Sequence, residues 1–251
     1  MLRNRSSYGV SALLVLVSGV GCGGEESAED IEIGATSAIV DNALTANALT
    51  ANALTANALT ANALTANALR DPLAREFLKY VVSCALDEGD SISIRVDGKN
   101  YKFEGSLGLA PDWGHDEHGT CDGSCQRWVS ACVLSRVDFA GVKRPISIRG
   151  DNRALRPEAG EMRNYSVAEG AYFGNLFIAG QPRYLCLAPG QDQDERVCGP
   201  SLANCPMKVV GACDDACDHV GAYKSFAECS SSGRADHYRV YEETITVFLP
   251  R

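Results

Sequence analysis

Apolar residues recur at helical spacing just after residue 70. Leu73, Phe77 and Val81 lie four apart with further apolar neighbours, a pattern typical of an amphipathic helix. Asp71-Pro72 provides an N-cap residue followed by a proline in the first turn. The spacing therefore predicts a helix that starts after Asp71 and ends before Gly89.

The pattern then changes from helical spacing to alternation. Residues 91–96 alternate polar and apolar side chains, as in a strand with one buried face. Asp97-Gly98 is a two-residue hairpin signal, and residues 101–103 provide a returning strand. We expect a β-hairpin here.

A second helix is predicted over residues 124–137. Cys125 and Cys132 fall on one side of it, about 10 Å apart along its axis. That separation is too large for a disulfide between them. We therefore expect each cysteine to attach this helix to another element.

The rest of the chain alternates short strand signals with turns. Residues 198–233 are rich in cysteine, glycine and serine and predict a loop-rich, disulfide-bonded region. The later strand candidates cover residues 145–149, 171–178, 183–187 and 238–249. Because no β-α-β alternation is present, we expect an α+β fold. In it, the N-terminal helix packs on a mainly antiparallel sheet that the final strand closes.

A five-residue repeat precedes these elements. Asn-Ala-Leu-Thr-Ala occurs five times in residues 42–66, and a truncated copy continues to Arg70. A period of five places the leucines on no single face of a helix or strand. The period is similar to that of pentapeptide-repeat proteins, which form β-helices, but the leucine lies one place later than in that family. We expect residues 42–70 to form a low-complexity stalk, with a β-helix as the alternative.

The beginning of the chain carries an export signal. Arg3 and Arg5 precede a short apolar run over residues 10–20, which is followed by Gly21-Cys22. The run is shorter than the approximately 20 residues of an ordinary transmembrane helix. Residues 1–21 therefore predict a signal peptide, and the acidic residues 22–41 predict a solvated tether.

The residues around Cys22 resemble a bacterial lipoprotein signal peptide, although Gly19 occupies a position where that family usually has Leu, Val or Ile. The resemblance implies lipidation of Cys22 and a membrane anchor through its acyl chains. Gly23, in place of Asp, implies the outer membrane, with the protein facing the periplasm or the cell surface. Ordinary signal cleavage and an uncleaved anchor remain alternatives.

Cysteine usage agrees with export. An even number of cysteines in an exported chain predicts a disulfide framework. Apart from Cys22 there are ten, at Cys84, Cys121, Cys125, Cys132, Cys186, Cys198, Cys205, Cys213, Cys217 and Cys229. The sequence leaves their pairing open. Zinc binding at Cys121/Cys125 or Cys213/Cys217 is the alternative.

The formal net charge of the chain is -9. An acidic chain repels phosphate backbones, so the composition predicts no nucleic-acid partner. The expected partners are the membrane, through the lipid on Cys22, and an unidentified envelope or extracellular ligand.

One loop holds candidate metal ligands. Residues 105–120 lack any periodicity, and within them His115, Asp116 and His118 offer nitrogen and oxygen donors. A solvated polar loop is the alternative, because the pair lacks the helical frame of a His-Glu-x-x-His site. The sequence predicts no organic cofactor.

Recognisable catalytic motifs are missing. The chain contains no Gly-x-Ser-x-Gly, His-Glu-x-x-His or Ser-x-x-Lys sequence. Residues 169–177 combine a carboxylate with aromatics and glycines, which favours a core strand over a glycosidase acid.

Four segments are similar to uncharacterised cysteine-rich lipoproteins of myxobacteria. These are residues 71–76, 80–86, 128–132 and 169–177, and the resemblance extends over most of residues 70–249. It implies the envelope compartment and no particular activity.

The sequence therefore predicts a disulfide-rich domain over residues 71–251, displayed on a stalk and lipid-anchored to the envelope. The expected function is non-catalytic binding or structural work. The alternative is an extracellular, metal-assisted enzyme that uses the 105–120 loop with His219 or His237.

Overall fold

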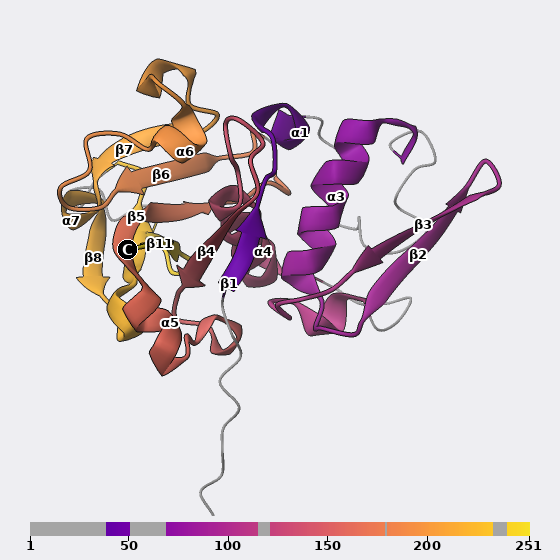
Figure 1. The fold of residues 1–251 in the computed structure, drawn as a ribbon, viewed down its shortest axis with the longest axis horizontal. Helices are drawn as coiled ribbons and strands as arrows, with labels where there is room; N and C mark the ends of the chain where they lie inside the picture. Colours follow the sequence, from indigo (N-terminus) through magenta and orange to yellow (C-terminus); the bar gives the residue numbers. More distant parts are fainter. Residues whose placement is uncertain (1–38, 51–68, 115–120, 179, 233–239) are drawn as a thin grey trace, which may run out of the picture. The chain divides into compact units, whose positions relative to one another are not determined.

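A computed structural model describes residues 39–50, 69–114, 121–178, 180–232 and 240–251. All of these belong to one folded unit, Gly34–Arg251. Its strands form three sheets, and its helices include two of more than ten residues. Figure 1 shows this unit and confirms the predicted α+β class with a mainly antiparallel main sheet.

The main sheet has six strands in the order β1-β4-β11-β5-β6-β7. Neighbouring strands run antiparallel except for the parallel pair β6–β7. The strand bounds are Ile39–Asn42 for β1, Arg144–Arg149 for β4, Ile245–Pro250 for β11, Tyr165–Gly174 for β5, Arg183–Leu187 for β6 and Lys208–Ala212 for β7.

The end of the chain does not form the single closing strand that alternation over residues 238–249 predicted. β11 lies inside the sheet, between β4 and β5. Val240–Tyr241 forms β10, which pairs with β9 in another sheet. The two strands separate because Thr244 makes a turn in which its hydroxyl donates to the Tyr241 carbonyl at 2.8 Å.

Two of the three strands of the second sheet lie within residues 198–233, the cysteine-rich region that the sequence predicted to be mostly loop. It contains β10, β9 (Phe226–Ser230) and β8 (Cys217–Val220) in that order. The third sheet is the predicted hairpin, formed by β2 (Ser91–Val96) and β3 (Lys99–Glu104). Asp97 and Gly98 both have positive φ, as a type I′ turn requires.

The predicted N-terminal helix is α3, Pro72–Ala85. The Asp71 side chain accepts a hydrogen bond from the Leu73 N–H at 2.9 Å, and Pro72 occupies the first turn, where its missing N–H costs no hydrogen bond. The buried side of α3 carries Phe77, Leu78 and Val81. α3 packs against β3 and α4, and Figure 1 shows it alongside the β2–β3 hairpin.

The second predicted helix is α4, Gly123–Ser135, which packs against β5 and β11 of the main sheet. The remaining helices are short. They are α1 (Ala46–Thr50), α5 (Ala159–Asn164), α6 (Glu195–Cys198) and α7 (Cys213–Ala216). Single 3₁₀ turns cover Pro111–Gly114, Arg153–Leu155, Leu202–Asn204 and Ala222–Lys224. In the described part of the chain, no helix is long and apolar enough to cross a membrane.

The folded unit starts earlier than the predicted boundary at residue 71. β1 pairs with β4, and the buried Asn42 side chain accepts a hydrogen bond from the Arg144 N–H at 2.9 Å. Leu44 and Ala48, from the first two repeat copies, are fully buried in the core.

This placement changes the interpretation of the repeat. Ala48 and Leu69 are both buried in the same folded unit. Residues 42–50 and 69–70 of the predicted stalk therefore belong to the fold. Residues 51–68 lie outside the described part of the chain, so for them the stalk stays a prediction.

All ten predicted cysteines form disulfides. The pairs are Cys84–Cys132, Cys121–Cys125, Cys186–Cys213, Cys198–Cys205 and Cys217–Cys229. Cys132 attaches α4 to α3, as expected. Cys125 instead bonds Cys121 in the turn before its own helix, so it attaches α4 to no distant element. Cys121 can form a disulfide with Cys125 because Cys121 precedes α4 and is not part of it.

The two disulfides of α4 differ in how much chain they enclose. Cys84 and Cys132 are 48 residues apart, whereas Cys121 and Cys125 are 4 apart. Replacing Cys84 and Cys132 together with alanine should lower the free energy of unfolding by about 4 kcal/mol, because the unfolded chain regains a long loop's entropy. The matched pair Cys121→Ala and Cys125→Ala should cost about 2 kcal/mol. Urea unfolding measures both, and equal losses would contradict the assignment.

Candidate functional site

Several residues that the sequence singled out lie outside the described part of the chain. Cys22, the candidate metal ligands His115, Asp116 and His118, and His237 are among them. His219 lies on β8, where the structure describes its backbone only. The metal-loop hypothesis thus stays a prediction, and the candidate site is built from other residues.

The main candidate is a surface groove of about 720 Å³ between α3 and β3. One wall is the exposed side of α3, and the other is β3 together with Gly105. The walls meet because the face of the hairpin that carries Ile92, Ile94 and Phe103 is buried. Figure 1 shows α3 and the hairpin side by side. We call this feature the α3/β3 groove.

The register of the hairpin determines which backbone groups line the groove. Val96 pairs with Lys99 across a two-residue turn, so these two residues exchange both hydrogen bonds. Alternate residues of an antiparallel pair point their N–H and C=O groups outward. In β3 these are Asn100, Lys102 and Glu104, and all three line the groove. Among the described strands, only β2 pairs with β3, so its outer edge is available for pairing.

Cations dominate the side chains near this edge. Tyr101, half-buried, lies between the Arg75 guanidinium and the Lys99 ammonium, each 5.2 Å from the ring centroid. Lys79 lies one helical turn beyond Arg75 on the same wall, and Lys102 lies on the opposite wall. The groove thus presents positive charge on a chain whose formal net charge is -9.

The carboxylates of the groove already have partners. The Glu76 carboxylate accepts a hydrogen bond from the Thr45 N–H at 2.9 Å, at the start of α1. Glu104 forms an ion pair with Lys102 at 3.0 Å. The described lining contains no histidine or cysteine. Its chemistry is therefore that of binding through backbone, aromatic and cationic groups.

A second cavity, of about 410 Å³, lies between the Asn175 region and the turn before β11. Its charged residues include Arg127 of α4 and Glu243, whose side chains form two hydrogen bonds across the cavity wall. Burial alone would raise the pKa of Glu243, but hydrogen bonding to Arg127 holds that pKa below its usual range. This carboxylate is therefore ionised and paired, which does not suit a general acid.

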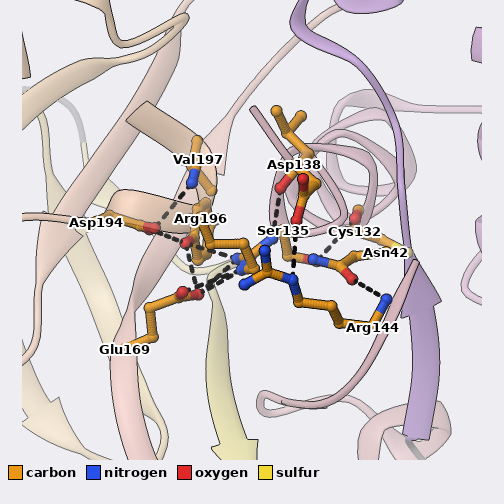
Figure 2. Close-up of polar contacts among 11 residues, drawn as sticks. Asn42, Cys132, Ser135, Asp138, Arg144, Glu169, Asp194, Arg196 and Val197 are labelled. Atoms are coloured by element: carbon orange, nitrogen blue, oxygen red, sulfur yellow. Dashed lines mark hydrogen bonds and ion pairs between the residues drawn. The ribbon is translucent and has the colours of Figure 1, made fainter. Parts of the chain in front are cut away.

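The most perturbed ionisable residues form a buried cluster between β5 and α6. It contains Glu169 and Tyr172 of β5, Arg196 of α6 and Asp194, the N-cap residue of α6. The Arg196 guanidinium donates to both Glu169 oxygens and to the Val137 carbonyl. The Tyr172 hydroxyl lies 3.0 Å from Glu169 and also contacts Asp194. Figure 2 shows Glu169, Asp194 and Arg196 pointing toward one another.

Burial sets the protonation of this cluster. Desolvation, reinforced by repulsion from Glu169, raises the pKa of Asp194 to about 7. Desolvation also raises the pKa of Tyr172 well above its usual value. Burial alone would lower the pKa of Arg196, but attraction from Tyr172 and Glu169 exceeds it and raises that pKa. Below that pKa Asp194 is neutral, and the cluster then holds the Arg196–Glu169 ion pair without the charge of a second carboxylate.

Perturbed pKa values often mark active sites, but geometry decides here. All four side chains are buried, and the α3/β3 groove and two other cavities of the described residues are lined by other residues. No route for a substrate is evident from these cavities to the carboxylates. The cluster instead fixes α6 to β5 and to the chain after α4, which is a structural role.

Neither the buried cluster nor the α3/β3 groove was predicted from the sequence. Glu169 was noted only as part of a predicted core strand, and Asp194 and Arg196 lie in a polar stretch without a motif. The groove could have been anticipated in part, because the hairpin and the exposed cations of α3 were visible in the sequence. The sequence does not show the packing that brings the hairpin and α3 together.

Comparison of the chain with protein-family models, with curated proteins and with solved structures finds no match.

The buried cluster generates a pH prediction. Because the pKa of Asp194 is raised in the folded state, folding takes up protons between about pH 4 and 7. The contribution of Asp194 to stability is therefore fully present at low pH and is lost as the pH rises through 7. Relative to an Asp194→Asn variant, the wild type should lose up to about 1 kcal/mol per pH unit in this window.

Asp194→Asn is the matched variant, because asparagine is also a good N-cap and stays neutral. Urea unfolding of both proteins from pH 5 to 8 gives the difference in free energy at each pH. A difference that is independent of pH would show that Asp194 is ionised throughout, and the assignment would be wrong.

Proposed function

We propose that this chain is a lipid-anchored protein of the bacterial cell envelope whose folded domain is a non-catalytic binding module. The anchor is the lipid on Cys22, and the ligand site is the α3/β3 groove. A likeness to the cysteine-rich lipoproteins of myxobacteria, carried by residues 71–76 and 128–132 among others, agrees with this compartment.

The observation that carries the binding proposal is the composition of the groove. An edge of β3 that pairs with no other described strand, a partly exposed Tyr101 and the cations Arg75, Lys79 and Lys102 line one concave surface. Ligand sites combine concavity with a few directed polar groups. The described lining offers no nucleophile activated by a base, because Ser83, its one hydroxyl besides Tyr101, accepts a hydrogen bond from Arg136 at 2.9 Å.

The five disulfides support the assignment to an exported protein. Disulfides persist in oxidising compartments and are rare where thiols are kept reduced. Their number also suits a domain exposed to the cell exterior or periplasm, because each restricts the unfolded chain. The export signal in residues 1–21 and the cysteine at position 22 lead to the same compartment.

The anchor is tested by the Cys22→Ala variant. Without the thiol no lipid can be attached, so the protein should move from the membrane fraction to the soluble envelope fraction or the medium. Gly23→Ala is the matched control and should remain in membranes. Fractionation with an antibody measures both, and membrane retention of Cys22→Ala would refute the lipid anchor.

The binding site is tested by photo-crosslinking in living cells. A photoreactive phenylalanine analogue replaces Lys102 in the groove or, as a control, the exposed Lys143, which pairs with Asp41. Irradiation should yield a discrete adduct from position 102 and none from position 143. Equal adducts, or none from position 102, would remove the groove as the ligand site.

A further inference from the structure

We infer that the α3/β3 groove binds an extended acidic peptide segment that adds to β3 as a new strand. The inference rests on the proposed function, because it names the ligand of the same groove. It follows from the register of the hairpin, the spacing of cations on α3 and the position of the two walls.

The backbone of β3 supplies the first requirement. Asn100, Lys102 and Glu104 point their N–H and C=O groups away from β2, at intervals of two residues. A peptide in extended conformation can pair with three such residues in the way that strand-addition domains bind their ligands. The edge is flanked by α3, so one face of the added strand would meet the helix.

The second requirement is side-chain complementarity on that face. Arg75 and Lys79 lie four residues apart on α3, which corresponds to about 6 Å along the helix axis. Alternate residues of a strand lie about 6.6 Å apart and point to the same side. Two acidic side chains at positions n and n+2 of the peptide therefore match the two cations.

The charge of the groove favours acidic over basic ligands. Arg75, Lys79 and Lys102 line it, and Lys99 lies over the adjoining Tyr101 ring. Glu76 and Glu104 oppose them, but Thr45 holds the first and Lys102 pairs with the second. An acidic segment thus gains contacts with Lys79 and with the Arg75 guanidinium, whose Nη1 also donates to the Leu69 and Arg70 carbonyls. A basic segment would face the same two cations. A second copy of this chain is disfavoured by its net charge of -9.

The arrangement also explains how the free protein avoids indiscriminate edge pairing. Exposed strand edges invite aggregation, and lysine side chains along an edge oppose it. Lys99 and Lys102 lie on β3, and the wall of α3 blocks a broad sheet from approaching. A single narrow strand with acidic side chains satisfies both restrictions.

The test uses the full mature chain in detergent and a fluorescent peptide, Gly-Thr-Val-Glu-Val-Glu-Val-Thr-Gly. Its control carries lysine in place of both glutamates. Fluorescence anisotropy should show saturable binding of the acidic peptide and at least tenfold weaker binding of the lysine peptide. Equal affinity for the two peptides would overturn the charge assignment.

Two protein variants separate charge from backbone pairing. Lys79→Glu should weaken the acidic peptide at least tenfold, whereas the remote Lys143→Glu should leave affinity unchanged. Lys102→Pro removes an outward N–H without breaking a bond to β2, because position 102 is not hydrogen-bonded to its partner Ser93. It should weaken binding at least fivefold relative to Lys102→Ala, which removes the charge but keeps the N–H.

A peptide variant keeps the test valid if Lys102→Pro does not fold. N-methylation of two alternate peptide amides removes the donors on one edge of the peptide, and a second peptide is methylated on the other edge. Strand addition predicts that one of the two loses binding at least tenfold and the other does not. Equal affinity of Lys102→Pro and Lys102→Ala, or no difference between the methylated peptides, would overturn strand addition.

Failure of the inference and failure of the proposed function give different results. If neither peptide binds while position 102 still forms a photo-adduct in cells, the groove binds another class of ligand and the inference is wrong. If the photo-adduct is also absent, the proposed function fails with it.

Discussion

The disulfide between Cys84 and Cys132 fixes the geometry on which the rest of the domain depends. Both cysteines are fully buried, and they join the end of α3 to the last turn of α4. α4 packs on β5 and β11, so the bond holds α3 against the helix that covers the main sheet. Because α3 is one wall of the α3/β3 groove, this disulfide also fixes the position of the groove in the domain.

The chain after the hairpin also holds the end of α3 in place. Residues 106–110 return along the end of α3, where the N–H groups of Ser106, Leu107 and Leu109 donate to α3 or C-cap carbonyls. The last turn of a helix leaves carbonyls without intrahelical partners, and these donors satisfy them. These hydrogen bonds fix the chain after β3 to the end of α3. The distance between β3 and α3 is therefore set by contacts near the base of the hairpin.

Charged side chains have different roles in the interior of the domain and on its surface. Arg196 and Glu169 are buried together and share Tyr172 and Asp194 as partners, so their bonds are all internal. Removing one member would leave an uncompensated buried charge, which is strongly destabilising. In the groove, Lys79 is exposed and Arg75 is half-buried, so both cations lie at the surface. The buried cluster with the largest pKa shifts is thus structural, and the α3/β3 groove is the binding candidate.

Local signals explain what the sequence could predict. The Asp71 cap, the apolar spacing of α3 and the Asp97-Gly98 turn act within a few residues, and the structure confirms all three. Features that depend on contacts between distant parts of the chain could not be predicted from the sequence. Leu44 lies in a repeat copy identical in sequence to the others, so its burial has no signal of its own in the sequence. The break between β10 and β11 depends on a turn at Thr244, and the buried cluster unites residues more than 20 positions apart.

The central claim is that the outer edge of β3 pairs with a ligand strand, and amide hydrogen exchange measured residue by residue tests it most directly. In the free protein, the amides of Tyr101 and Phe103, bonded to β2, should exchange slowly, and those of Asn100, Lys102 and Glu104 should exchange rapidly. Saturating acidic peptide should slow exchange at the outward amides. Bound peptide that leaves these amides unprotected would contradict the account.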